Sequence, residues 1–233
     1  LSYYSDESST NDENDNIEYF RDLSKPMGQQ SPHRAQKYDA IFTETNHSFF
    51  YGTHYSYPGA VLYYLLRIEP YTLHNVVFHH GFDHPDRVFL SINQVWRSAS
   101  ELNQSDVKEL IPEFYCFSSM FENVNHYKFP QRSDGTQIDN VQLPNWGKDP
   151  ITFVHLMRKS LECDEVSSKL HLWIDLIFGY KQRGQAAIDA VNVFQPLAYD
   201  TAITTIINES SNNSLFKQDL PDPNIDITMN YAL

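Results

Sequence analysis

Residues 163–184 read C-D-E-V-S-S-K-L-H-L-W-I-D-L-I-F-G-Y-K-Q-R-G, and they give the clearest indication of the fold class. Five apolar residues recur in this stretch at i, i+4, i+7, i+8 and i+11, which is the spacing of one helix face. Gly179 then stands where helices commonly end in a left-handed residue. We predict a helix with Trp173 buried, so that Trp173→Ala lowers stability by about 3–5 kcal/mol. The five residues are Val166, Leu170, Trp173, Ile174 and Ile177.

Further helix signals lie on both sides of this stretch. Ser31-Pro32 and Asp149-Pro150 each place a capping side chain before a proline that suits the first helical turn. Strand signals are weak, because no sustained alternation of apolar and polar residues appears. The sequence therefore predicts a mainly α protein with long irregular connections. The other predicted helices cover residues 33–42, 60–67, 87–98, 153–161 and 187–194.

Composition excludes several classes of function. The chain has 233 residues with a net charge of -13, so it lacks the basic surface that nucleic-acid binding usually requires. Two cysteines in unrelated contexts indicate neither a disulfide framework nor a cysteine zinc site, and they suit a reducing cytosol. No apolar run approaches the roughly 20 residues that span a bilayer. Any membrane association is therefore expected to be peripheral.

The acidic charge is concentrated at the two ends of the chain. Residues 1–18 hold six acids and no base, and residues 200–233 hold five acids and one lysine. Both segments are poor in aliphatic residues, so they bury too little apolar surface to offset the entropy of ordering. We predict that 1–18 is disordered, that 200–233 is mostly flexible, and that 19–199 forms the folded domain.

The densest polar string is His79-His80-Gly81-Phe82-Asp83-His84-Pro85-Asp86. Histidine and aspartate bind zinc or iron, but this string runs into a predicted helix start, where its carboxylates already have a capping role. We expect capping of the helix over 87–98 and no metal site. No glycine-rich phosphate loop, dinucleotide motif or serine elbow occurs, so no cofactor is indicated. An alternative hypothesis is a hydrolase or metal enzyme that uses His54, Asp83, His84, His171 and Asp175.

Four bases are candidates for contact with a partner. Lys181 and Arg183 follow the predicted helix that contains Trp173, where they either oppose the helix dipole or bind an acidic surface. Arg21 and Arg87 lie in polar stretches nearer the N-terminus. For all four bases two roles stay open: ion pairs within the chain, or a face that meets another domain.

Six ordered blocks of sequence resemble successive signatures of the BEACH domain, the family named for beige and Chediak-Higashi proteins and found in neurobeachin-like scaffolds. The resemblance covers about residues 19–199 and includes V-Q-L-P-N-W at 141–146. The family's opening portion is not recognisable before Phe20, so we expect a partial domain. The six blocks are F-R-D-L-S-K-P-M-G (20–28), G-T-H-Y-S (52–56), R-I-E-P-Y-T (67–72), F-D-H-P-D-R (82–87), residues 106–115 and residues 171–184.

The resemblance implies a BEACH fold, with helices packed around a core of irregular extended peptide segments. It implies no enzymatic activity and no cofactor. Family members are large cytoplasmic scaffolds that act in vesicle trafficking, membrane fission and fusion, lysosome-related organelles and autophagy. A PH-like domain typically precedes the BEACH domain and packs on it, and WD40 repeats typically follow. The expected partners are therefore these domains and trafficking proteins, with indirect, peripheral association with membranes.

Overall fold

The structure is a computed structural model that describes residues 21–103 and 105–199. Backbone contacts divide the chain into two units, residues 1–195 and residues 196–233. All α-helices of the described residues lie in the first unit, which is described here by itself. The two acidic ends lie outside the described residues, so the division of the chain inferred from charge stays a prediction.

The described residues form seven α-helices, one π-helical turn (Ser98–Leu102) and several short 3-10 turns, without a strand longer than an isolated bridge. This confirms the mainly α class. None of these helices is both long and apolar enough to cross a bilayer. The helices are α1 (Pro32–Glu44), α2 (Pro58–Tyr64), α3 (Tyr71–His79), α4 (Ile92–Arg97), α5 (Pro150–Leu161), α6 (Asp164–Ile177) and α7 (Gly184–Asp189).

Four of the predicted helices occur as α1, α2, α5 and α6, with ends shifted by a few residues. Asp149 caps α5 as predicted, since its carboxylate accepts hydrogen bonds from the backbone N–H groups of Ile151 and Thr152 at 3.0 and 2.9 Å. The side chain of Ser31, in contrast, makes no capping hydrogen bond at the start of α1. Helix α3 was not predicted, because threonine, histidine, asparagine and valine in this segment are weak helix formers.

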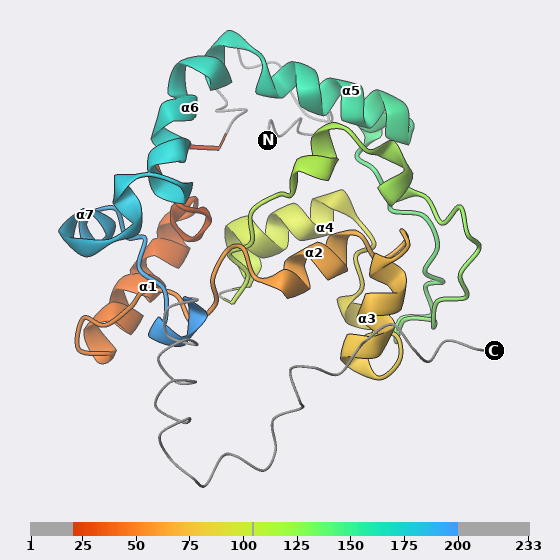
Figure 1. Cartoon of the computed structure of the whole chain (residues 1–233), viewed down its shortest axis with the longest axis horizontal. Coiled ribbons are helices and arrows are strands. Elements are labelled where there is room, and N and C mark those ends of the chain that lie inside the picture. The colour runs from red at the N-terminus through yellow and green to blue at the C-terminus, as the bar shows by residue number, and fades with distance from the viewer. Residues whose placement is uncertain (1–20, 104, 200–233) are drawn as a thin grey trace, which may run out of the picture. The chain divides into compact units, whose positions relative to one another are not determined.

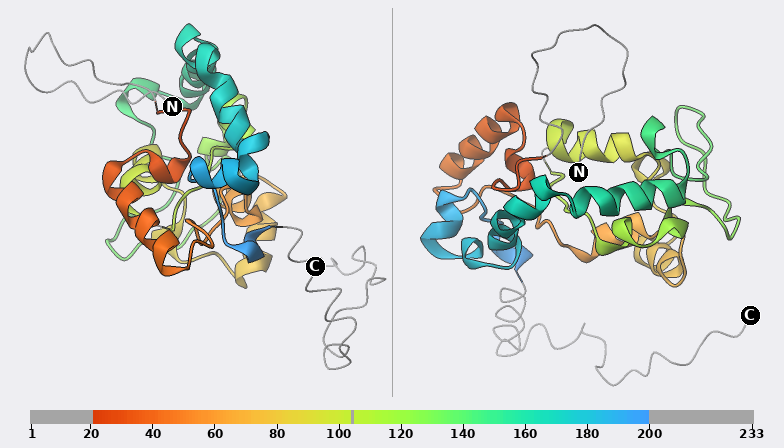
Figure 2. Two further views of the ribbon diagram at one scale, coloured as in Figure 1. Left: turned by 90° about the vertical axis from the view of Figure 1, so that its left-hand side faces the viewer. Right: turned by 90° about the horizontal axis from the view of Figure 1, so that it is seen from above.

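The main core combines helices with irregular segments. Phe89, Phe121 and Val141 lie outside the α-helices and are at most 5% exposed. They pack with residues of α2, α4 and α5, among them Tyr64 and Phe153. Figure 1 shows the long stretch without an α-helix between α4 and α5, and Figure 2 shows it from two further sides. The expected arrangement of helices around irregular extended segments is therefore confirmed.

The predicted helix over 87–98 is wrong in its first five residues. The string that precedes it forms only a single 3-10 turn, η2 (Pro85–Arg87), and α4 begins at Ile92 with Ser91 as its N-cap. The chain between them is extended because Gln142 pairs with it: the N–H of Gln142 donates to Leu90 at 2.7 Å, and its carbonyl accepts from Ile92 at 3.0 Å. A partner about 50 residues away in sequence thus prevents the helix from starting earlier.

The last predicted helix, over 187–194, is also shorter than expected. Helix α7 ends at Asp189, and Val191 has a left-handed φ of 53°. The following segment pairs with Tyr51 instead: the N–H groups of Phe50 and Tyr51 donate to the carbonyl of Val193 at 3.0 and 3.2 Å. Phe194 is therefore buried by an extended segment and not by a helix face.

Helix α6 forms where its spacing predicts, but its apolar face is only partly covered. Val166, Leu176 and Ile177 are buried, whereas Trp173 is half-buried and Ile174 is exposed. The prediction of a buried Trp173 is therefore wrong, since Trp173 is only half-buried. The spacing identified the apolar face correctly, but it carries no information on how much of that face the rest of the chain covers.

The prediction of a left-handed Gly179 is also wrong, since Gly179 has a φ of -104°. Glycine is required here for close approach, because a Cβ at this position would lie 2.7 Å from the Cα of Asp175. We expect Gly179→Ala to lower the free energy of unfolding by about 1–3 kcal/mol, as overpacking against backbone does. Urea unfolding followed by circular dichroism measures this change.

Gly52→Ala is the matched control, because no atom of the described residues lies within 4 Å of a Cβ at Gly52. Its free energy of unfolding should change by no more than about 0.5 kcal/mol. Equal effects of the two substitutions would contradict the close approach at Gly179.

Candidate interaction surface

The C-terminal end of α6 and the turn that follows, η7 (Tyr180–Gln182), carry exposed aromatic and basic side chains together. Ile174, Phe178 and Tyr180 are 43%, 73% and 65% exposed. The half-buried ring of Trp173 lies edge-on to Phe178, with 5.7 Å between ring centroids. The term α6–η7 surface is used below for six residues: Trp173, Ile174, Phe178, Tyr180, Lys181 and Arg183.

Two amide side chains donate hydrogen bonds to the backbone of this surface. Asn192 is 1% exposed, and its Nδ2 donates hydrogen bonds of 2.9 Å to the carbonyl oxygens of Leu176 and Lys181. Gln182 Nε2 donates to the carbonyl oxygen of Ile177. These bonds satisfy carbonyl groups at the end of α6 and in η7, and the Ile177 carbonyl also accepts from the Tyr55 hydroxyl at 3.0 Å. The surface is therefore ordered before any partner binds, which reduces the entropy lost on binding.

Lys181 and Arg183 supply positive charge to this surface. Lys181 Nζ lies 5.8 Å from the centre of the exposed Tyr180 ring, within the range of a cation–π contact. Arg183 is exposed, and within the described part of the chain neither base forms an ion pair with a carboxylate. Both charges are therefore open to a partner.

Arg21 and Arg87 are engaged within the chain instead. Arg21 donates to both carboxylate oxygens of Glu109, at 2.6 and 2.9 Å, and the two side chains are 7% and 12% exposed. Burial by itself disfavours the charged guanidinium, but Glu109 more than offsets this and raises the pKa of Arg21. Arg87 donates to Asp83 at 2.6 Å on the surface. For these two bases the structure shows the ion-pair alternative.

The polar string over 79–86 has a structural role. His84 Nδ1 accepts the N–H of Asp86 at 3.3 Å and so caps η2, while Asp83 accepts from the N–H of His84 at 2.7 Å. The prediction that the carboxylates cap the helix start is wrong, because the cap of η2 is the His84 ring, while Asp83 accepts from the adjacent N–H of His84 and Asp86 accepts from the distant N–H of Ser133 at 3.0 Å. Within the described residues, no group of three or more His, Cys, Asp or Glu side chains could hold a metal ion.

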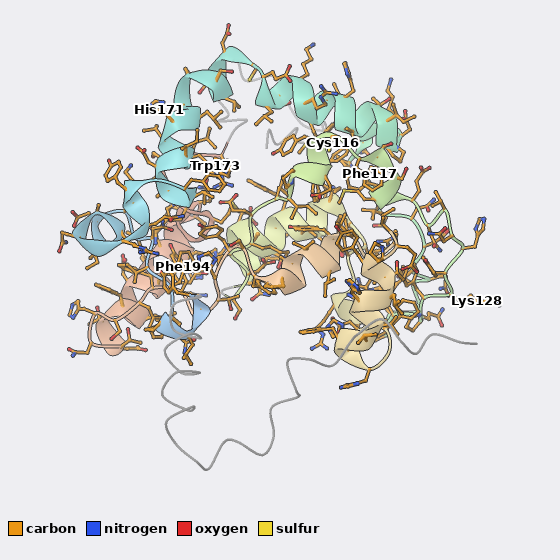
Figure 3. The ribbon with its side chains drawn as sticks, in the orientation of Figure 1. Cys116, Phe117, Lys128, His171, Trp173 and Phe194 are labelled. Carbon is orange, nitrogen blue, oxygen red and sulfur yellow. The ribbon has the colours of Figure 1, made fainter. Side chains whose placement is uncertain are left out.

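The remaining residues of the enzyme hypothesis lie on other elements. His54 belongs to the segment before α2, and its ring lies 4.1 Å from that of Tyr55 and 4.6 Å from that of Phe194. His171 is exposed on α6, on the opposite side of the helix from Trp173 (Figure 3). No hydrogen bond in the described part of the chain joins His171 to Asp175.

Two buried arginines were not predicted. Arg34 is 1% exposed and donates to the hydroxyl of Tyr38 at 2.7 Å, and their i, i+4 spacing in α1 could have revealed this pair. Arg67 is 0% exposed, and its Nε donates to the carbonyl of Asp139 at 2.7 Å. Its guanidinium lies 5.4 Å from the centre of the Phe129 ring, and burial lowers its pKa to about 10. No local sequence signal reveals Arg67, because both partners are far away in the sequence.

Comparison with known proteins identifies the family of this chain. The family model of the Beige/BEACH domain matches residues 2–221. The chain is 44% identical over 196 residues to a putative neurobeachin homolog of Caenorhabditis elegans, which covers 82% of this chain and 8% of that protein. It is 46% identical over 198 residues to Beige protein homolog 1 of Schizosaccharomyces pombe, covering 81% of this chain and 8% of that protein. The chain thus spans about 8% of the length of these relatives. By this match over most of its length, the chain belongs to the Beige/BEACH domain family.

Proposed function

We propose that this chain is a non-enzymatic interaction module of a large BEACH-type scaffold. The parent protein acts in the cytoplasm, in vesicle trafficking and membrane dynamics, and associates with membranes or vesicles peripherally and indirectly. An adjacent PH-like domain docks on the α6–η7 surface. WD40 repeats of the same parent protein and other trafficking proteins are its further partners.

The observation that carries this proposal is the combination of exposed rings and unpaired bases on one ordered surface. Phe178 and Tyr180 are more than half exposed, and Lys181 and Arg183 lie directly beside them. Aromatic residues and arginine are enriched at protein interfaces, where they supply most of the binding energy. The residues considered for catalysis lie instead on three separate elements, which favours a binding role over a catalytic one.

Charge reversal tests the docking. The double variant Lys181→Glu/Arg183→Glu should bind a separately supplied PH-like domain of the parent protein about tenfold more weakly, because like charges then face an acidic surface. Isothermal titration calorimetry measures the affinity. Circular dichroism should show unchanged helix content, since neither base forms an ion pair within the described part of the chain.

A second double variant, Lys37→Glu/Lys128→Glu, is the matched control. Both lysines are exposed, and their reversal changes the net charge by the same amount. Lys37 belongs to α1, and Lys128 lies away from the α6–η7 surface (Figure 3). This variant should bind as the unmodified chain does. Equal weakening in both variants would indicate a general effect of charge, and unchanged binding in both would overturn docking at α6–η7.

A further inference from the structure

The start of the described chain lies close to the α6–η7 surface. Arg21 is paired with Glu109, and the backbone N–H of Glu109 donates to the carbonyl oxygen of Tyr55 at 3.3 Å. The hydroxyl of Tyr55 in turn donates to the carbonyl oxygen of Ile177 at 3.0 Å, at the C-terminal end of α6. The segment that precedes Arg21 therefore joins the described chain next to this surface.

This segment and the α6–η7 surface carry opposite charges. Residues 1–18 hold six acids and no base. Among residues 173–186, Lys181 and Arg183 are accompanied by a single acid, Asp175, and neither base forms an ion pair with a carboxylate of the described residues. Carboxylates form the strongest hydrogen bonds with such bases. The acids of the segment therefore supply the counter-charge that the surface lacks.

The segment also carries aromatic side chains and is long enough to reach the surface. Tyr3 and Tyr4 lie close to its acids in the sequence. They suit the exposed rings of Phe178 and Tyr180, because aromatic side chains favour edge-on and offset contacts with one another. A chain of 18 residues extends over about 60 Å. Segments too polar to fold by themselves commonly bind in this way.

We propose that residues 1–18 of this chain bind the α6–η7 surface and compete there with the PH-like domain. Acids of the segment pair with Lys181 and Arg183, and its tyrosines pack against Phe178 and Tyr180. The competition rests on the proposed function, whereas the contact itself does not. Because the segment is tethered beside the surface, its effective concentration there is high, and a separate domain binds only the fraction of molecules whose surface is free.

Photo-crosslinking within the full chain tests the contact without a partner. The variant Phe178→p-benzoylphenylalanine keeps an aromatic ring at the surface and, on irradiation, reacts with C–H bonds close to it. Peptide mass mapping should show a product with the mass of one chain, in which position 178 is joined to residues 1–18. A product with the mass of two chains would identify a second copy as the occupant and overturn the proposal, as would the absence of any link to residues 1–18.

The control places the same probe on a different exposed ring. Phe78 is 65% exposed and belongs to α3. Phe78→p-benzoylphenylalanine should give no link to residues 1–18. Equal yields of this link from positions 78 and 178 would show that the segment has no preferred surface, which also overturns the proposal.

Neutralising acids of the segment tests the role of charge. A variant with five neutralised acids in residues 1–18 should form the link about tenfold less and should bind a separately supplied PH-like domain about tenfold more tightly. A control variant with five neutralised acids in residues 200–233 should change neither. Equal effects of the two variants, or an unchanged yield in the first, would contradict the proposal. The first variant is Asp6→Asn/Glu7→Gln/Asp12→Asn/Glu13→Gln/Asp15→Asn, and the control is Asp200→Asn/Glu209→Gln/Asp219→Asn/Asp222→Asn/Asp226→Asn.

These measurements distinguish a failure of this inference from a failure of the proposed function. If the link forms but Lys181→Glu/Arg183→Glu leaves binding of the PH-like domain unchanged, the docking of that domain is wrong and the contact of the segment stands. If the charge reversal weakens that binding but no link forms, the contact of the segment is wrong and the docking stands.

Discussion

Phe121→Ala is expected to lower the free energy of unfolding by about 3–5 kcal/mol, because truncating a buried phenylalanine leaves a cavity in the core. Phe121 is 0% exposed. Its ring meets Phe114 and Phe153, with 5.5 and 5.1 Å between ring centroids. It therefore joins an irregular segment to α5 at the centre of the main core. Urea unfolding followed by tryptophan fluorescence measures the change.

Phe117→Ala is the matched control, because Phe117 is 38% exposed and lies just four residues away (Figure 3). Its truncation should lower stability by about 1 kcal/mol, as expected for a side chain that water already reaches. For the same reason we expect about 1–2 kcal/mol for Trp173→Ala, less than the sequence-based value. A loss from Phe117→Ala as large as that from Phe121→Ala would show that the assigned core is wrong.

Glu109→Gln is expected to lower the free energy of unfolding by about 3 kcal/mol, since it leaves the guanidinium of Arg21 buried without a counter-charge. The substitution keeps the shape of the side chain, but it removes the charge and replaces one of the two oxygens that accept from Arg21 with an amide donor. Arg21 and Glu109 are 88 residues apart in the sequence, so their ion pair holds the start of the described chain against the segment before η4 (Pro112–Tyr115). Chemical denaturation of the single variant gives the change.

Two further variants distinguish the cost of an unpaired buried charge from the cost of breaking any ion pair. The double variant Arg21→Met/Glu109→Leu should recover most of the lost stability, because no unpaired charge then remains buried. Glu165→Gln breaks the exposed pair with Lys169 and should change stability by no more than about 0.5 kcal/mol. If the losses from Arg21→Met and Glu109→Leu simply added in the double variant, the two side chains would not act as a pair.

The sequence by itself determined the mainly α class, the positions of four helices and the family. The relevant signals are local: Asp149-Pro150 starts α5 within a few residues, and the spacing of apolar residues in α6 needs only one helix. The ordered blocks between Phe20 and Gly184 needed no structure either. The charged candidates Lys181 and Arg183 could be selected in the same way, as bases that follow a predicted helix end.

Only the tertiary structure decided what each element meets. Gln142 turns the chain before α4 into an extended segment, and Glu109 takes Arg21 out of the set of free bases. Each of these contacts joins residues that are far apart in the sequence and meet only in the folded chain. Hydrophobic spacing states which face of a helix is apolar, but whether that face is covered depends on segments far away in the sequence. The exposure of the α6–η7 surface and the enclosure of Arg34 therefore follow from the packing of distant segments, which no local pattern encodes.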